Sequence, residues 1–194
     1  MRLRYSALLL ALTGVMLTAQ GPGTWAIRDA PPELRPVIAR ADLMIAAMHD
    51  SVLRELADAF EGGGADKAIL SCHIDSLLIA QHISREGVAA GRTSDRLRNP
   101  TNTPQPWAAG LVKAYAGRQA RDVDGFAVDL GERVGVLRPI SERSICGNCH
   151  GPADRLSAGV RAEIAERYPA DKAVGFREGE IRGWFWVEIP KRPR

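Results

Sequence analysis

An apolar stripe at helical spacing in the first third of the chain restricts the fold more than any other sequence feature. From Leu34 to Phe60, apolar side chains recur at steps of mostly three and four residues, which places them on one face of a helix. Three consecutive glycines, Gly62 to Gly64, end this pattern. A second helix is predicted from Asp66, its N-terminal cap, to about Ser84. The fold is therefore expected to begin with two long helices.

Shorter segments follow the second helix. The sequence predicts a loop from Arg92 to Pro106, which contains three prolines, and a helix from Trp107 to Gln119. Short strands are predicted at residues 126–130 and 134–137, then a capped helix at 157–168 and a closing strand at 181–189. Alternation in this last strand predicts that Ile181, Gly183, Phe185, Val187 and Ile189 share one face and Trp184 and Trp186 the other. Helices followed by strands indicate an α+β fold with an antiparallel sheet, in a single domain of residues 27–194.

The first 26 residues are typical of a secretory signal peptide. Arg2 and Arg4 precede fifteen uncharged and mostly apolar residues, and residues 20–23 then break a helix. Thr24 and Ala26 supply the small side chains that a signal peptidase requires, which predicts a cut after Ala26 and a signal peptide of residues 1–26. The folded domain is therefore expected outside the cytoplasm, in the periplasm or an equivalent compartment.

Two alternatives to this cut remain open. A cut after Ala19 would place Leu17 in a pocket that accepts small side chains. An uncleaved anchor is the other alternative, because no charge appears from Tyr5 to Ile27, a span that can cross a bilayer. No second stretch of the sequence approaches that length, so no membrane span is expected after cleavage.

The charge balance argues against nucleic acid as a partner. Without the two arginines of the signal, 24 Lys and Arg remain beside 23 Asp and Glu, a net charge of +1. The two signs alternate along the chain, whereas a phosphate-binding surface needs clustered cations.

The strongest chemical motif is Cys146-Gly147-Asn148-Cys149-His150, a CxxCH sequence. This is the attachment signature of c-type haem. Two thiols three residues apart can reach the two vinyl groups of one porphyrin, and the adjacent histidine then lies beneath the iron as the proximal ligand. The sequence predicts one covalently attached haem, held by Cys146, Cys149 and His150. The predicted export agrees with this interpretation, because c-type haem is attached to exported proteins outside the cytoplasm.

Three other interpretations of the motif are weaker. A disulfide between Cys146 and Cys149 would close a very small loop. A thioredoxin-like pair is expected to open a helix after a strand in a βαβ unit, and no such pattern is present. Zinc requires four ligands, and beyond the motif only Cys72 and scattered histidines remain.

Cys72 lies on an apolar face of the second predicted helix and has no disulfide partner once the motif cysteines bind haem. It is either a small buried thiol in the core or the sixth ligand of the iron, opposite His150. His73 competes for that position, but it points about a quarter-turn away round the helix. Met44 and Met48 are expected in the core of the first helix, and His49 and His82 are expected to be solvated or hydrogen-bonded.

Several sequence blocks in one order point to a known family. They are Cys72; Gly91 to Ser94; Leu97 to Pro100 with Asn102; Leu137 to Ile140; Cys146 to Gly151; Tyr168-Pro169; Asp171 to Ala173; Gly175-Phe176; Gly179; and Arg182-Gly183. From about Ala68 to Pro190, the chain resembles the bacterial c-type haem domains with a PAS-like fold, which occur as exported proteins and as extracytoplasmic sensor modules of histidine kinases. The resemblance implies a PAS-like antiparallel sheet with long N-terminal helices. It also implies that Cys146 and Cys149 bind the haem, with His150 and Cys72 as axial ligands.

Arg92 and Arg98 within these blocks are either partners of the haem propionates or exposed loop residues. The expected function is redox or gas sensing, in which reduction weakens the bond between Cys72 and iron and opens a position on the metal. A periplasmic electron carrier is the alternative, and an enzyme such as a peroxidase is the least favoured. A sensor of this size needs a separate signalling or redox partner protein.

Overall fold

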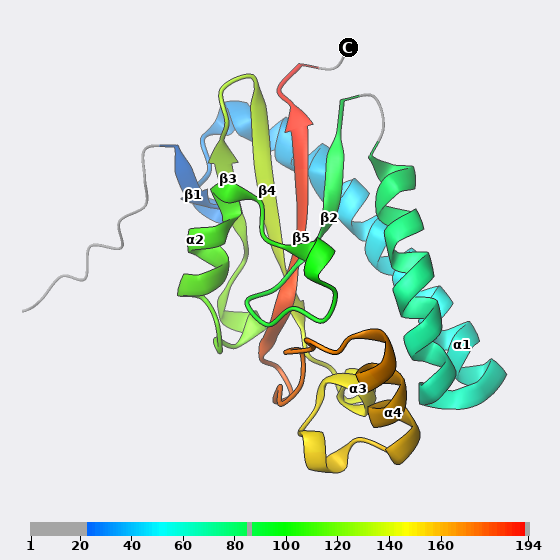
Figure 1. The fold of residues 1–194 in the computed structure, drawn as a ribbon. Helices are drawn as coiled ribbons and strands as arrows, with labels where there is room; N and C mark the ends of the chain where they lie inside the picture. The colour runs from blue at the N-terminus through cyan, green and yellow to red at the C-terminus, as the bar shows by residue number, and fades with distance from the viewer. Residues whose placement is uncertain (1–22, 85–86, 193–194) are drawn as a thin grey trace, which may run out of the picture.

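The computed structural model describes residues 23–84 and 87–192, without the side chains of residues 70–80, 82 and 83. Its centre is a five-stranded antiparallel sheet in the order β1-β3-β4-β5-β2 (Figure 1). The strands are β1 (Thr24–Ala26), β2 (Ala89–Thr93), β3 (Phe126–Asp129), β4 (Arg133–Ser141) and β5 (Ile181–Pro190). The helices are α1 (Arg35–Ile83), α2 (Pro106–Ala114), α3 (Gly147–His150) and α4 (Ala158–Arg167). The predicted α+β class and antiparallel sheet are confirmed.

Helix α1 consists of two helical halves joined at a glycine break. Gly63 and Gly64 have non-helical backbone angles, and Gly64 has a φ of 76°, in the left-handed region that glycine adopts without strain. The two halves run side by side in Figure 1, the first behind the sheet and the second along its β2 edge. Both predicted helices and the glycine break between them are therefore confirmed.

The first half of α1 buries its apolar stripe against one face of the sheet. This layer of the core contains Leu34, Val37, Ile38, Ala41, Ile45 and Met48 from the helix and Val134, Val136, Phe185, Val187 and Ile189 from the strands. Met48 is buried and Met44 packs against the same cluster, as the sequence predicts. The stripe continues beyond Met48, where Val52, Leu56 and Phe60 line a cavity instead.

Helix α2 covers the opposite face of the sheet. Ala108 and Val112 pack there with Phe126, Leu137 and Trp184. The helix ends at Ala114, earlier than the predicted Gln119, and the chain turns at Gly117, which has a φ of 73°. The two apolar layers leave the sheet buried on both faces.

Strand β5 follows the predicted alternation except at its first residue. Trp184 and Trp186 face α2, whereas Phe185, Val187 and Ile189 face α1. Ile181 was predicted to share the face of Phe185, which is wrong, because it packs in the α2 cluster with Trp184. The cause is a register shift between Ile140 and Ser141 of β4, since an irregularity in pairing reverses the alternation of side chains.

Some observed boundaries of strands and loops near the sheet differ from the predicted ones. Strand β2 extends to Thr93 and a short 3-10 helix spans Pro100–Asn102, so the predicted loop from Arg92 to Pro106 is partly regular. Strand β4 runs to Ser141, past the predicted end at Leu137. Its Pro139 lies beyond the last residue that pairs with β3, where a missing backbone N–H costs no bond to that strand.

The N-terminal strand β1 occupies one edge of the sheet. Thr24 to Ala26 pair with Val128 to Phe126 of β3, and Trp25 packs against the α1 layer of the core. A cut after Ala26 would remove this strand from the fold. Residues 1–22 of the predicted signal peptide lie outside the described residues. Among the helices of the described part, none has the length and apolar character needed to cross a membrane.

Candidate functional site

The CxxCH segment forms a tight turn beyond the end of β4. The backbone N–H groups of Cys146 and Gly147 both donate to the carbonyl of Arg143, and α3 then makes one helical turn from Gly147 to His150. Gly151 closes this turn by donating to the Gly147 carbonyl at 3.1 Å. A Cβ on Gly151 would lie 2.6 Å from that oxygen, so the approach requires glycine.

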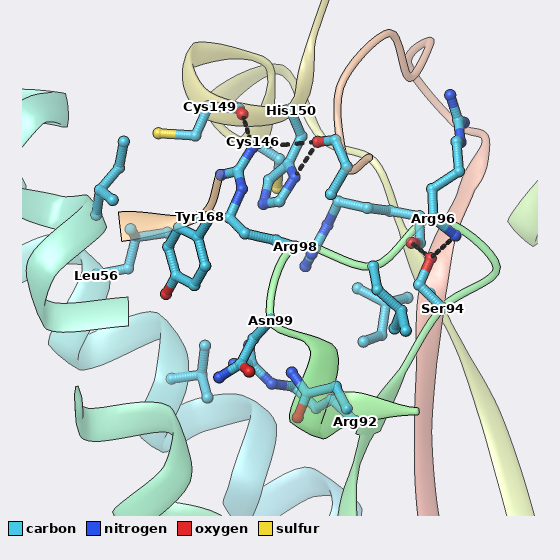
Figure 2. Close-up of a pocket in the computed structure, with 18 of the residues that line it drawn as sticks. Leu56, Arg92, Ser94, Arg96, Arg98, Asn99, Cys146, Cys149, His150 and Tyr168 are labelled. Carbon is cyan, nitrogen blue, oxygen red and sulfur yellow. Dashed lines mark hydrogen bonds between the residues drawn. The ribbon is translucent and has the colours of Figure 1, made fainter. Parts of the chain in front are cut away.

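Both motif cysteines and His150 line one cavity, between the second half of α1, the loop after β2 and the ends of β4 and β5 (Figure 2). Both cysteines are partly exposed, and neither forms a disulfide with another described residue. The space between the lining side chains, including its open mouth, is about 1060 Å³. The three motif residues predicted to act together are therefore brought together by the fold.

One wall of the cavity is apolar and comes mainly from α1. Val52, Leu56 and Phe60 come from its first half, and Ala68 and Ile69 from its second. Ile69 also packs against Leu156, Val160, Ile164 and Tyr168, and Cys149 contacts the same cluster. The second half of α1, α4 and the motif thus share one small core.

The opposite side of the cavity carries arginines from β2, from the loop after it and from β5. Arg92, Arg96, Arg98 and Arg182 all line it. Arg98, labelled in Figure 2, forms an ion pair with Asp171, its Nε lying 3.1 Å from Oδ1. Arg96 pairs with Glu180 at 2.6 Å and lies over the ring of Phe176. Arg182 Nε also lies 3.5 Å from Glu142 Oε2, so Arg96, Arg98 and Arg182 each form an ion pair within the protein.

His150 is fixed by a backbone hydrogen bond. Its Nδ1 lies 2.8 Å from the carbonyl oxygen of Ala173, and because a carbonyl can only accept, Nδ1 must carry the proton. Loss of water around the ring, followed by the nearby charges of Arg182 and Arg98, lowers the pKa of His150 well below its usual value. The ring is therefore neutral at neutral pH, with the lone pair on Nε2 available to a metal.

Two of the candidate ligands in α1 lie outside the described residues. Cys72 and His73 fall in the stretch whose side chains are not described, and so does His82. His49 is described, and its ring meets the edge of Phe185 at 5.6 Å between centroids. The sequence did not predict that Val52, Leu56 and Phe60 line a cavity. A signal was present, because the apolar stripe continues past Met48, the last of its residues in the core against the sheet.

A family model and one solved structure are similar to this chain. A family model described as Tll0287-like matches residues 32–190. No curated protein matches the chain. Among solved structures, the crystal structure of the cyanobacterial haem protein Tll0287 matches with 23% sequence identity and a TM-score of 0.59. The match covers 85% of this chain and 99% of that one, which indicates a shared fold.

Proposed function

The chain belongs to the Tll0287-like family, and from this premise we propose that it is an exported c-type haem protein that senses a redox change or a diatomic gas. The observation that carries the proposal is that both CxxCH thiols and the neighbouring His150 line one cavity. The solved structure that shares this fold is described as a haem protein, which supports the same ligand here.

The residues of the cavity fit a haem group. An apolar wall from α1 suits the face of a porphyrin, and the arginines opposite suit its carboxylates. The imidazole of His150 is held in the tautomer that leaves Nε2 free to bind iron. Neither Cys146 nor Cys149 forms a disulfide with another described residue, and a thioether requires each sulfur to be outside a disulfide.

Each motif residue has a distinct part in this proposal. Cys146 and Cys149 would hold one haem through thioether bonds, and His150 would bind its iron. Bound there, the haem supplies an iron that exchanges one electron and that binds a diatomic gas when a position is open. The apolar side chains of α1 that line the cavity would limit the access of water to the bond between His150 and the iron.

Cys72 is proposed as the distal ligand. It lies one helical turn beyond Ala68 and Ile69, and both of these residues line the cavity. A thiolate donates negative charge and favours ferric iron, so reduction is expected to weaken this bond. His73 is the alternative ligand, and the experiment below separates the two.

Movement of the second half of α1 would carry the signal. Gly63 and Gly64 provide a hinge between the halves, and Ile69 connects the second half to Val160 of α4 and to Leu156, which precedes that helix. Release of Cys72 would therefore bias two arrangements of one helix that is packed against α4. A separate partner protein would detect the change. We also propose that the chain is PAS-like, as the resemblance implies.

The contacts of Arg98 argue against its predicted role as a partner of the haem propionates. Arg98 is committed to Asp171 and to two backbone carbonyls. Arg92 lines the same cavity, on β2.

Electron transfer is the second candidate function. Ile145 is 45% exposed beside Cys146 at the cavity, and an exposed apolar side chain next to a redox group favours contact with a partner protein. In that case both axial ligands are expected to stay bound in both oxidation states.

The test compares haem-loaded wild type with Cys72→Ala by absorption and electron paramagnetic resonance, in oxidised and reduced forms. Sensing through Cys72 predicts a low-spin thiolate signal that the substitution removes, and carbon monoxide uptake by the reduced wild type. His73→Ala is the matched control and is expected to keep the thiolate signal. An unchanged spectrum in Cys72→Ala, with no carbon monoxide uptake, would favour the electron carrier.

A further inference from the structure

Arg98 joins the CxxCH segment to the loop at residues 171–173. Its Nε donates to Asp171 Oδ1 at 3.1 Å and its Nη2 to Oδ2 at 3.2 Å. The same Nη2 donates to the carbonyls of Cys149, at 2.6 Å, and Ala173, at 3.2 Å. The side chains of Arg98 and Asp171 are only 13% and 7% exposed, so solvent screens this ion pair weakly.

The carbonyl of Ala173 accepts from two donors that differ in charge. One is His150 Nδ1 at 2.8 Å, and the other is the cationic Nη2 of Arg98 at 3.2 Å. Asp171 orders the same residue, since its Oδ1 accepts from the backbone N–H of Ala173 at 3.0 Å. A carbonyl that already accepts from a cation has less electron density to offer its second donor.

We propose that Arg98 and Asp171 are positioning residues that set the strength of the His150 hydrogen bond and, through it, the reduction potential of the iron that His150 holds. This inference rests on the proposed haem function. Donation from Arg98 weakens acceptance by Ala173, so the imidazole keeps less anionic character and stabilises ferric iron less. Asp171 opposes Arg98, because its carboxylate neutralises the guanidinium.

The two partners of this ion pair therefore act in opposite directions on the iron. Arg98→Gln removes the positive charge and frees the Ala173 carbonyl for His150, so ferric iron is favoured and the reduction potential falls. Asp171→Asn keeps the shape of the side chain but leaves the Arg98 charge uncompensated, so the potential rises. If the ion pair had only a structural role, the two substitutions would not shift the reduction potential in opposite directions, because both break the same contact.

Arg96 offers a matched control in the same loop. It also lines the cavity and pairs with a carboxylate, Glu180, and it donates to the carbonyl of Val174 at 3.0 Å. Among the described contacts, it makes no hydrogen bond to Ala173 or His150. Arg96→Gln therefore removes a comparable cation without changing the acceptor that His150 uses.

The experiment is a redox titration of haem-loaded wild type, Arg98→Gln, Asp171→Asn and Arg96→Gln. We expect the iron of Arg98→Gln to be about tenfold harder to reduce, which is about 59 mV for a one-electron couple. Asp171→Asn is expected to shift the other way and Arg96→Gln to shift much less. Arg98→Lys, which restores the charge, is expected to recover part of the loss.

Shifts of Arg98→Gln and Asp171→Asn in the same direction, or no shift in either, would overturn the inference. Equal shifts in Arg98→Gln and Arg96→Gln would also overturn it, because general charge would then explain both. If Arg98→Gln does not fold, Asp171→Asn tests the inference alone. A higher reduction potential in this variant supports the inference, and an unchanged or lower one overturns it. A wild type without covalent haem would instead overturn the proposed function itself, and this is visible before any variant is compared.

Discussion

Glu142 Oε2 lies 3.5 Å from Arg182 Nε, and in the described part of the chain neither oxygen of this carboxylate has a hydrogen bond. Glu142 is only 2% exposed. Loss of water raises the pKa of its carboxyl to about 7, against the opposing effect of Arg182, while Glu180 raises it further. A buried carboxyl group that keeps its proton near neutral pH therefore lies next to Arg182, one of the arginines that line the cavity.

Glu142 is expected to make stability depend on pH. Its pKa in the folded protein is about 7 against an ordinary value of 4.5, so the folded state binds more protons between these values. The free energy of unfolding contributed by this group therefore falls as pH rises from about 4.5 through about 7. Glu142→Gln is expected to remove this slope in denaturant unfolding measured across that range. Glu163→Gln on α4, which breaks a pair with Arg167 at the surface, is the control and is expected to keep it.

The turn of the CxxCH segment is expected to reject a side chain at Gly151. In Gly151→Ala the new Cβ meets the Gly147 carbonyl, which is expected to lower the free energy of unfolding by about 1 to 3 kcal/mol and to reduce the covalently bound haem. Gly147→Ala is the matched control, because a Cβ there meets nothing within 4 Å. Equal losses in the two variants, by denaturant unfolding and mass spectrometry, would contradict this account of the turn.

The small core beneath the motif is expected to hold the second half of α1. Leu156 is 4% exposed and belongs to this core, so Leu156→Ala is expected to lower the free energy of unfolding by about 2 to 5 kcal/mol. Leu43→Ala removes the same atoms from a side chain that is 73% exposed, and the expected change is within about 0.5 kcal/mol. Chemical denaturation measures both, and similar losses would show that burial does not decide the effect.

Strand β1 is expected to stabilise the sheet although it is short. A chain that starts at Ile27 loses the pairing with β3 and the packing of Trp25, which is expected to cost about 2 kcal/mol. The comparison chain starts at Gln20, as a cut after Ala19 would leave it. Thermal unfolding of the two chains checks this, and equal midpoints would mean that the fold does not need β1.

Much of the fold follows from local sequence patterns. The helices on either side of the glycine break and the alternation of Trp184, Phe185 and Val187 were predictable, because each pattern has the period of its element. Ile181 escaped prediction because the irregularity after Ile140 depends on the pairing of β4 with β5. The role of Cys72 stays a prediction, as its side chain lies outside the described residues.

The sequence by itself determined the spacing of the CxxCH residues and the faces of the long helices, because both depend on positions within a few residues. Only the tertiary structure decided what surrounds the motif. It placed Arg98 between Asp171 and the Ala173 carbonyl that His150 uses, although 52 residues separate the numbers 98 and 150. It also turned the end of the first helical stripe, from Val52 to Phe60, into a cavity wall. Such contacts arise from the way the sheet and helices pack, and no local period encodes them.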